Sequence, residues 1–333
     1  MESRFEILYF PCFSNGQPTT GPVLGVEQST AAGGSASVAR HPPLRRGRRR
    51  RLRLPVANFE NGFNMGAQNP DGSCKTTADW TRDFQVVQGW STSTVKYNTF
   101  KLYSTNDCDT LKNAVPAAQA VGAKIWAGVW AVDEAKFNAE KGALEYAMQT
   151  WGTDWLAGVN VGSESLYRME IDPVKLAIQI WDVKGMVNEA YKAGVLVGCA
   201  DTWTSWVNGT NAIVIEASDI IMMNGFPYWQ GSTIEQAKDI FYQSIAATKA
   251  VINGKPFMIG ETGWPTGGDN FGSAVPTVDN LQSYWKSATC ALQADNIPYF
   301  FFSTFDEPNR SAGVEQHFGV ANSDKSLKIS LAC

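Results

Sequence analysis

Short apolar segments alternate with longer amphipathic segments from Asn58 to the end of the chain. The short segments are rich in β-branched and aromatic residues, as strands are, whereas the long ones repeat apolar residues at helical spacing. The eight predicted strands begin near Gly62, Asn98, Lys124, Gly158, Val195, Asp219, Pro256 and Pro298. The predicted helices between them include residues 77–90, 133–151, 173–193, 233–251 and 279–294.

This alternation predicts an α/β fold with parallel strands. The strand segments are almost continuously apolar, which indicates burial on both faces. Eight strand–helix units in about 275 residues favour a single (β/α)8 TIM barrel over an open doubly wound sheet. No GxGxxG or GxxxxGK[ST] phosphate loop is present in the sequence.

The first 57 residues differ from the rest in composition. Residues 14–53 are rich in Gly, Pro, Ser, Thr and Arg, which predicts a disordered tail before a catalytic domain at 58–333. A solvated tail or a mispredicted first exon is favoured over a basic targeting or processing signal. No signal peptide is readable, because the apolar segment 7–13 is short and contains Pro11. No apolar run reaches about 18 residues, so no transmembrane helix is expected.

The charge distribution separates the same two parts. The tail carries nine Arg and three Glu, whereas the whole chain has a net charge of -4, so residues 58–333 are acidic. An acidic body argues against nucleic acid or an anionic membrane as a partner. The 12 Trp and 17 Phe fit either a hydrophobic core or surfaces that stack on sugar rings, and composition leaves both open.

The six cysteines are spread along the chain without a CxxC metal motif. Cys74 with Cys108 and Cys290 with Cys333 are expected to close loops in an oxidising compartment. Cys199 lies in an apolar run and is expected to be a buried free thiol. N-glycosylation sequons at Asn208 and Asn309 are compatible with secretion.

Polar residues gather where the predicted strands end, at the face where barrels of this kind build active sites. Glu164 ends the fourth strand and Glu261 the seventh, so they are expected to converge across the barrel mouth. Either glutamate alone could be a structural ion pair or a helix cap. Together, two carboxyl groups roughly 5 Å apart suit a retaining glycosidase, which requires no metal and no cofactor.

Other chemistries fit the sequence poorly. Only two histidines are present, His41 and His317, which excludes a His-ligated metal cluster and disfavours a Ser-His-Asp triad. No GxSxG motif occurs. No lysine ends a predicted strand, which disfavours Schiff-base or enolate chemistry.

The segments Val161-Gly-Ser-Glu-Ser-Leu-Tyr-Arg168 and Gly260-Glu-Thr-Gly-Trp-Pro-Thr266 resemble the two signature segments of glycoside hydrolase family 17. Six further stretches are similar to its fungal branch: Gly62 to Asn64, Asp71 to Lys75, Lys101 to Ser104, Asp201 to Trp203, Asn224 to Gly231 and Phe305 to Pro308. The resemblance covers most of the chain from Gly62 onwards. It implies a retaining (β/α)8 hydrolase acting on β-1,3-glucan, with Glu164 as acid/base and Glu261 as nucleophile.

The resemblance also implies substrate-binding residues. Tyr228 and Trp264 would line the cleft and stack on glucose rings, and Glu307, beside Asp306, would influence the ionisation of the nucleophile. Ser163 replaces the asparagine that precedes the acid in much of the wider clan, so its shorter hydroxyl is expected to reach less far towards the sugar or to act through water. Four more candidates rest on position alone: Tyr103, Asp201, Trp203 and Asn224.

The sequence thus predicts a secreted or cell-wall β-1,3-glucanase that is monomeric and binds β-glucan chains. A glucanosyltransferase, in which a second sugar attacks the glycosyl-enzyme, is the alternative within the enzyme class. A non-catalytic glucan-binding wall protein is disfavoured, because it would need aromatic residues but not the acid pair.

Overall fold

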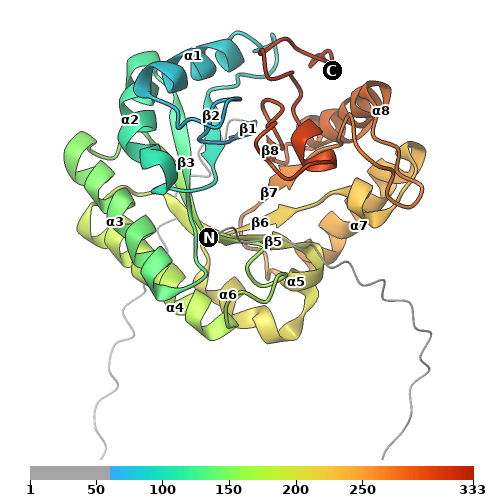
Figure 1. Cartoon of the computed structure of the whole chain (residues 1–333). Helices are drawn as coiled ribbons and strands as arrows, with labels where there is room; N and C mark the ends of the chain where they lie inside the picture. The colour runs from blue at the N-terminus through green and yellow to red at the C-terminus, as the bar shows by residue number, and fades with distance from the viewer. Residues whose placement is uncertain (1–60) are drawn as a thin grey trace, which may run out of the picture. The chain divides into compact units, whose positions relative to one another are not determined.

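The structure, a computed structural model, describes residues 61–333. Eight parallel strands close a barrel in sequential order, with helices around it (Figure 1). The strands are β1 (Gly62–Met65), β2 (Thr99–Leu102), β3 (Lys124–Val129), β4 (Leu156–Ser163), β5 (Leu196–Thr202), β6 (Ile220–Asn224), β7 (Phe257–Thr262) and β8 (Tyr299–Phe301). The predicted (β/α)8 barrel is confirmed. The predicted tail lies outside the described residues, and the domain boundary stays a prediction.

The helices follow the predicted segments closely. They are α1 (Thr77–Gln88), α2 (Thr110–Val121), α3 (Glu134–Trp151), α4 (Pro173–Lys184), α5 (Trp203–Val207), α6 (Ala212–Ala217), α7 (Ile234–Val251), α8 (Val278–Tyr284) and α9 (Cys290–Ala294). Two predicted helices are interrupted by π-helical turns: Gly185–Ala190 follows α4, and Trp285–Thr289 joins α8 to α9.

Local chemistry sets the starts of several helices. Thr76 and Asp79 form a reciprocal capping box at α1, which satisfies two N–H groups that the helix itself leaves free. The Asp172 side chain accepts from the backbone N–H of Val174, and Pro173 takes the first helical position of α4. These ends are therefore specified by the local sequence.

Strand alternation divides the buried residues into two layers. Phe63 packs against Trp285, and Phe100 stacks on Phe84 of α1, so both phenylalanines face the surrounding helices. Asn64 and Lys101, their neighbours in sequence, therefore face the barrel interior and pair in register between β1 and β2. The interior layer also contains an apolar cluster of Trp126, Ala200, Ile220, Met222, Met258 and Phe300.

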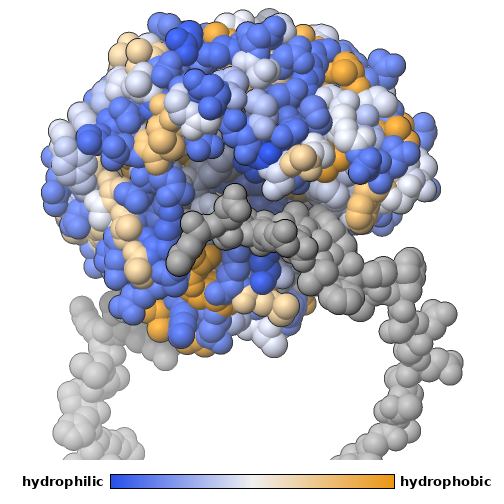
Figure 2. Space-filling model, viewed as in Figure 1, coloured by the Kyte–Doolittle hydropathy of each residue, from blue (hydrophilic) through white to orange (hydrophobic). Residues whose placement is uncertain are grey.

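Both expected disulfides are present, Cys74–Cys108 and Cys290–Cys333, and Cys199 is a buried free thiol. On the face drawn in Figure 2, most of the coloured surface is hydrophilic and the hydrophobic residues form small patches. Within residues 61–333, no helix combines the length and apolarity that a membrane span requires.

Candidate active site

Glu164 directly follows β4, and Glu261 lies near the carboxyl end of β7. Asn224, the last residue of β6, connects them. Its backbone pairs in register with Glu261, and its Nδ2 donates to Glu164 Oε1 at 3.1 Å. The two carboxyl side chains predicted from sequence are therefore brought to the same mouth of the barrel.

The environment of Glu164 favours its protonated form. Burial, followed by the negative charge of Glu261, raises its pKa from the ordinary value of 4.5 to about 7. Arg168 opposes this rise, with Nη1 at 3.2 Å from Glu164 Oε2. A carboxyl group that is protonated near neutral pH can donate a proton to a leaving oxygen.

The backbone around Glu164 is unusual for a strand end. Gly162 has φ +79° and Glu164 has φ +56°, and the pairing register between β4 and β5 shifts between Asn160 and Ser163. Non-glycine residues seldom adopt positive φ, and such conformations occur preferentially at functional sites. The buried Asp201 side chain accepts from the backbone N–H of Leu166 at 3.0 Å, which fixes the loop that follows.

Glu261 has a partner that the sequence analysis did not identify. The Lys101 ammonium donates to Glu261 Oε1 at 2.8 Å and to Asn64 Oδ1 at 3.0 Å. β2 ends at Leu102, so this lysine is the second-last residue of its strand. A charged residue on the inward face of an apolar strand was the signal that could have revealed it.

A cavity of about 450 Å³ is lined in part by Asn64, whose side chain accepts a hydrogen bond from Lys101, the partner of Glu261. Tyr103, Trp130, Glu307 and Arg310 are among the residues that line it. The Tyr103 hydroxyl is buried and has no hydrogen-bond partner among residues 61–333, and burial raises its pKa, so it stays neutral.

The wall of this cavity is held by charge and aromatic contacts. The Arg310 guanidinium lies 5.1 Å from the Tyr103 ring centre and 5.3 Å from that of Phe302. Arg310 also forms an ion pair with Glu307. Glu307 thus lines the cavity, while the direct ionic contact of Glu261 is Lys101.

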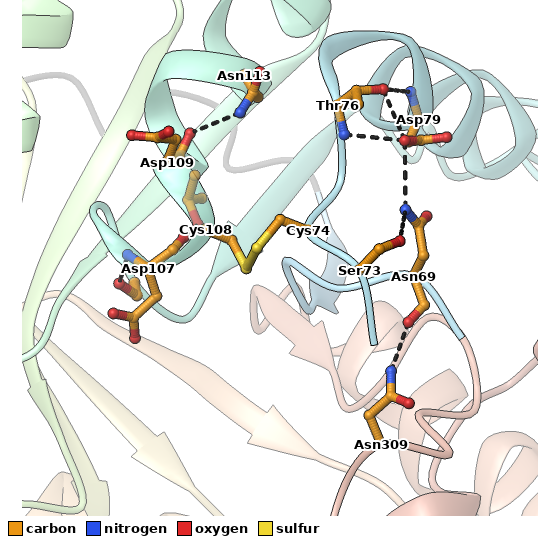
Figure 3. The surroundings of a disulfide bond; sticks show 12 residues. Asn69, Ser73, Cys74, Thr76, Asp79, Asp107, Cys108, Asp109, Asn113 and Asn309 are labelled. Carbon is orange, nitrogen blue, oxygen red and sulfur yellow. Dashed lines mark hydrogen bonds between the residues drawn. A yellow bond between two sulfur atoms is a disulfide. The ribbon is translucent and has the colours of Figure 1, made fainter. Parts of the chain in front are cut away.

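The Cys74–Cys108 disulfide (Figure 3) lies next to the cavity, which Cys108 helps to line. Cys74, in the loop after β1, is joined to Cys108, in the loop after β2. Asn309, in the loop after β8, donates from Nδ2 to the backbone carbonyl of Asn69. Three loops that line the cavity are therefore connected to each other by covalent or hydrogen bonds.

The expected role of Tyr228 and Trp264 differs from what the structure contains. Both side chains are fully buried, and their rings pack edge to face at 5.6 Å. Tyr228 donates to the backbone carbonyl of Asp269, and Trp264 Nε1 to that of Val275 at 2.9 Å. Neither ring presents a face on which glucose could stack, so both residues belong to the hydrophobic core.

The remaining candidates occupy different positions. The carboxylate of Asp306 accepts from Lys328 at 2.6 Å and from the backbone of Gly319, which ties it to the C-terminal segment. Trp203 begins α5 after β5 and is half-buried. Ser163 Oγ lies 3.5 Å from Asn224 Nδ2, so it belongs to the mouth near Glu164.

No group of three or more His, Cys, Asp or Glu side chains within 61–333 is arranged to hold a metal ion.

The chain matches the family model described as the BtgE/BtgC glycoside hydrolase domain over residues 62–319. It is 40% identical to the glucan 1,3-beta-glucosidase of Saccharomyces cerevisiae over 82% of this chain and 91% of the relative. Identity to the enzyme of the same name from Schizosaccharomyces pombe is 38%, over 81% and 86%.

A solved structure with the same architecture is the glycoside hydrolase family 17 beta-1,3-glucanosyltransferase from Rhizomucor miehei. The TM-score is 0.74 at 34% identity, covering 83% of this chain and 98% of that one. Beta-1,3-glucanase CJP38 from Cryptomeria japonica pollen is 15% identical with a TM-score of 0.61, which supports the fold alone.

Proposed function

Because the chain belongs to the BtgE/BtgC glycoside hydrolases of family 17, we propose that it cleaves β-1,3-glucan with retention of anomeric configuration. Glu261 acts as nucleophile and Glu164 as acid/base. The observation that carries the proposal is the carboxyl pair at one barrel mouth, in which the pKa of Glu164 is raised to about 7 by burial and by Glu261. The names of the relatives support the substrate.

The reaction proceeds in two displacements. A carboxylate oxygen of Glu261 bonds to the anomeric carbon while the glycosidic bond breaks, and Glu164 gives its proton to the leaving oxygen. Water then gives a proton to Glu164 and bonds to the same carbon, which releases the Glu261 carboxylate. Tyr103 lines the adjoining cavity and is a candidate contact for the sugar chain.

The proposal extends to location and assembly. Two disulfides favour an oxidising compartment, and relatives named for glucan cleavage favour a secreted or wall-associated enzyme. We propose that it acts as a monomer, which sedimentation would test. Glycosylation at Asn208 and Asn309 remains a prediction, and both residues are exposed.

The test is incubation of the purified protein with laminari-oligosaccharides, with products followed by chromatography and the first anomer followed by NMR. We expect β-anomer and shorter chains. The Glu164→Gln and Glu261→Gln variants should each lose most activity while melting cooperatively, since an amide can neither donate an acidic proton nor attack. Binding without turnover by the wild type would instead favour the glucan-binding alternative.

The similarity to a glucanosyltransferase supports transfer as a second candidate activity. Transfer uses the same two glutamates and differs in whether a sugar or water attacks the glycosyl-enzyme. Products longer than the starting chain, increasing with oligosaccharide concentration, would establish transfer. Their absence at high concentration would leave hydrolysis alone.

A further inference from the structure

Lys101 is a charged residue within the barrel interior. Its side chain is 1% exposed, and its ammonium lies 2.8 Å from Glu261 Oε1. Removing an ammonium and a carboxylate from water costs several kcal/mol per ion, and a close pair with further hydrogen bonds offsets that cost only in part. Apolar residues could fill the same space without this cost, so the pair calls for an explanation beyond packing.

The surroundings fix the direction of the ammonium. Asn64 Nδ2 donates to the backbone carbonyls of Gly260 and Phe300 at 3.2 and 3.3 Å, which turns its Oδ1 towards Lys101. Lys101 Nζ donates to that oxygen at 3.0 Å. The Asn64 amide and the Glu261 carboxylate therefore hold the Lys101 ammonium between them inside the barrel.

The Lys101 contact distinguishes the two oxygens of Glu261. Oε1 accepts from the ammonium, whereas Oε2 accepts no hydrogen bond from any other part of the described chain. Oε2 is thus the oxygen left to attack the anomeric carbon. A carboxylate held by one oxygen cannot rotate freely, and restricting the attacking group in this way accelerates a displacement.

The other carboxyl group, that of Glu164, forms an ion pair with a different cation. Arg168 pairs with Glu164 from the rim, where its side chain is 32% exposed. The pair of Glu261 is screened from solvent on both sides, with side-chain exposures of 1% and 12%. Solvent weakens the rim pair much more than the interior one.

We propose that Lys101 is a positioning residue for the nucleophile: its ammonium holds Glu261 through Oε1 and leaves Oε2 free to attack. This inference rests on the proposed function. Other titratable groups that act electrostatically on Glu261 are Glu164 after β4, Glu315 in the turn after β8, and Tyr103 after β2. Lys101 is the cation in direct contact with it among the described residues.

The experiment measures kcat/KM against pH for Lys101→Met with a 2,4-dinitrophenyl β-laminaribioside. This leaving group departs without a proton, so the rate reports on Glu261 rather than Glu164. We expect kcat/KM to fall by about 10²-fold. The acidic limb of its pH profile should move to higher pH by about 1 pH unit or more. Lys101→Arg, which keeps the charge, should retain the acidic limb near that of the wild type.

Two further variants separate charge from folding. Lys101→Gln can still donate a hydrogen bond to Glu261 but carries no charge, so its acidic limb should move as in Lys101→Met. It replaces the methionine variant in the experiment if that variant does not fold. Lys328→Met removes another buried lysine, one that pairs with Asp306. It should lower the melting temperature without moving the limb.

The outcomes distinguish this inference from the proposed function. If Glu261→Gln is inactive while the folded neutral Lys101 variants keep the wild-type acidic limb and rate, the role of Lys101 is overturned and the two-glutamate assignment stands. If Glu261→Gln itself turns over the aryl glycoside like the wild type, the proposed function fails.

Discussion

The side chain of Glu164 is subject to opposing electrostatic influences. Burial and the charge of Glu261 raise its pKa, whereas Arg168 and the Asn224 amide lower it. The raising influences are larger, and the result is a pKa of about 7. At the residue scale, the two proposed roles therefore rest on the unequal surroundings of two chemically identical groups.

This pKa predicts the alkaline side of the activity profile. With unactivated β-1,3-oligosaccharides, kcat/KM should fall as pH rises through about 7, because Glu164 then loses the proton that it must donate. With the dinitrophenyl substrate the fall should be absent, since no proton is needed. Parallel pH profiles for the two substrates test this, and a shared alkaline limb would contradict the assignment of Glu164.

At the scale of elements, both glutamates follow a break in regular strand pairing. In β7, Met258 contributes to the interior cluster and Ile259 to the outer core, so strict alternation would turn Glu261 towards the helices. The register between β6 and β7 shifts between Met223 and Asn224, and Glu261 reaches the mouth. Irregular pairing of this kind redirects side chains near active sites.

The equivalent break in β4 lies at Gly162, and substitution there should reduce activity much more than stability. In Gly162→Ala, the new Cβ would lie 3.2 Å from Leu176 Cδ1 at a backbone φ of +79°. We expect a loss of stability of roughly 1–2 kcal/mol. Activity should fall by about 10²-fold, because a displaced Glu164 no longer lies in line with the leaving oxygen. Thermal melting and kcat/KM measure the two effects.

Gly142→Ala is the matched control. Gly142 lies inside α3, and no atom lies within 4 Å of the Cβ that the substitution adds. It should stabilise the protein by about 0.5–1 kcal/mol with unchanged activity. Full activity in Gly162→Ala would show that the conformation at that position does not determine where Glu164 points.

At the scale of the whole molecule, residues 61–333 contain every group that the proposed reaction uses. Strand closure from β1 to β8 places Asn64 against carbonyls of β7 and β8, so the site exists only when the barrel is complete. The Cys74–Cys108 disulfide closes a sequence separation of 34 residues. Loop entropy assigns such a link about 4 kcal/mol.

A chain beginning at Asn58 should therefore fold and keep the full kcat/KM on laminari-oligosaccharides. The site residues and both disulfides all lie after that position. Comparison of its melting curve and kinetics with those of the full chain tests this prediction. A severalfold drop in activity on removal of residues 1–57 would mean that the tail contributes to catalysis or folding.

The sequence alone determined the number of strands, their positions, the two glutamates at the ends of the fourth and seventh strands, and both cysteine pairs. These features depend on periods of two and 3.6 residues and on short motifs, which are local properties. The predicted strand starts at Gly62 and Lys124 coincide with those observed. The predicted helix start at Pro173 likewise coincides with the observed one.

Tertiary structure alone decided which side chains meet. Lys101 and Glu261 are 160 residues apart in sequence, and only barrel closure and strand register bring them together. Tyr228 and Trp264 follow strand ends, as cleft residues do, yet neighbouring aromatic rings cover them completely. A local pattern specifies which residues are apolar or charged, whereas burial and pairing depend on the sum of long-range contacts around each residue, which no single segment contains.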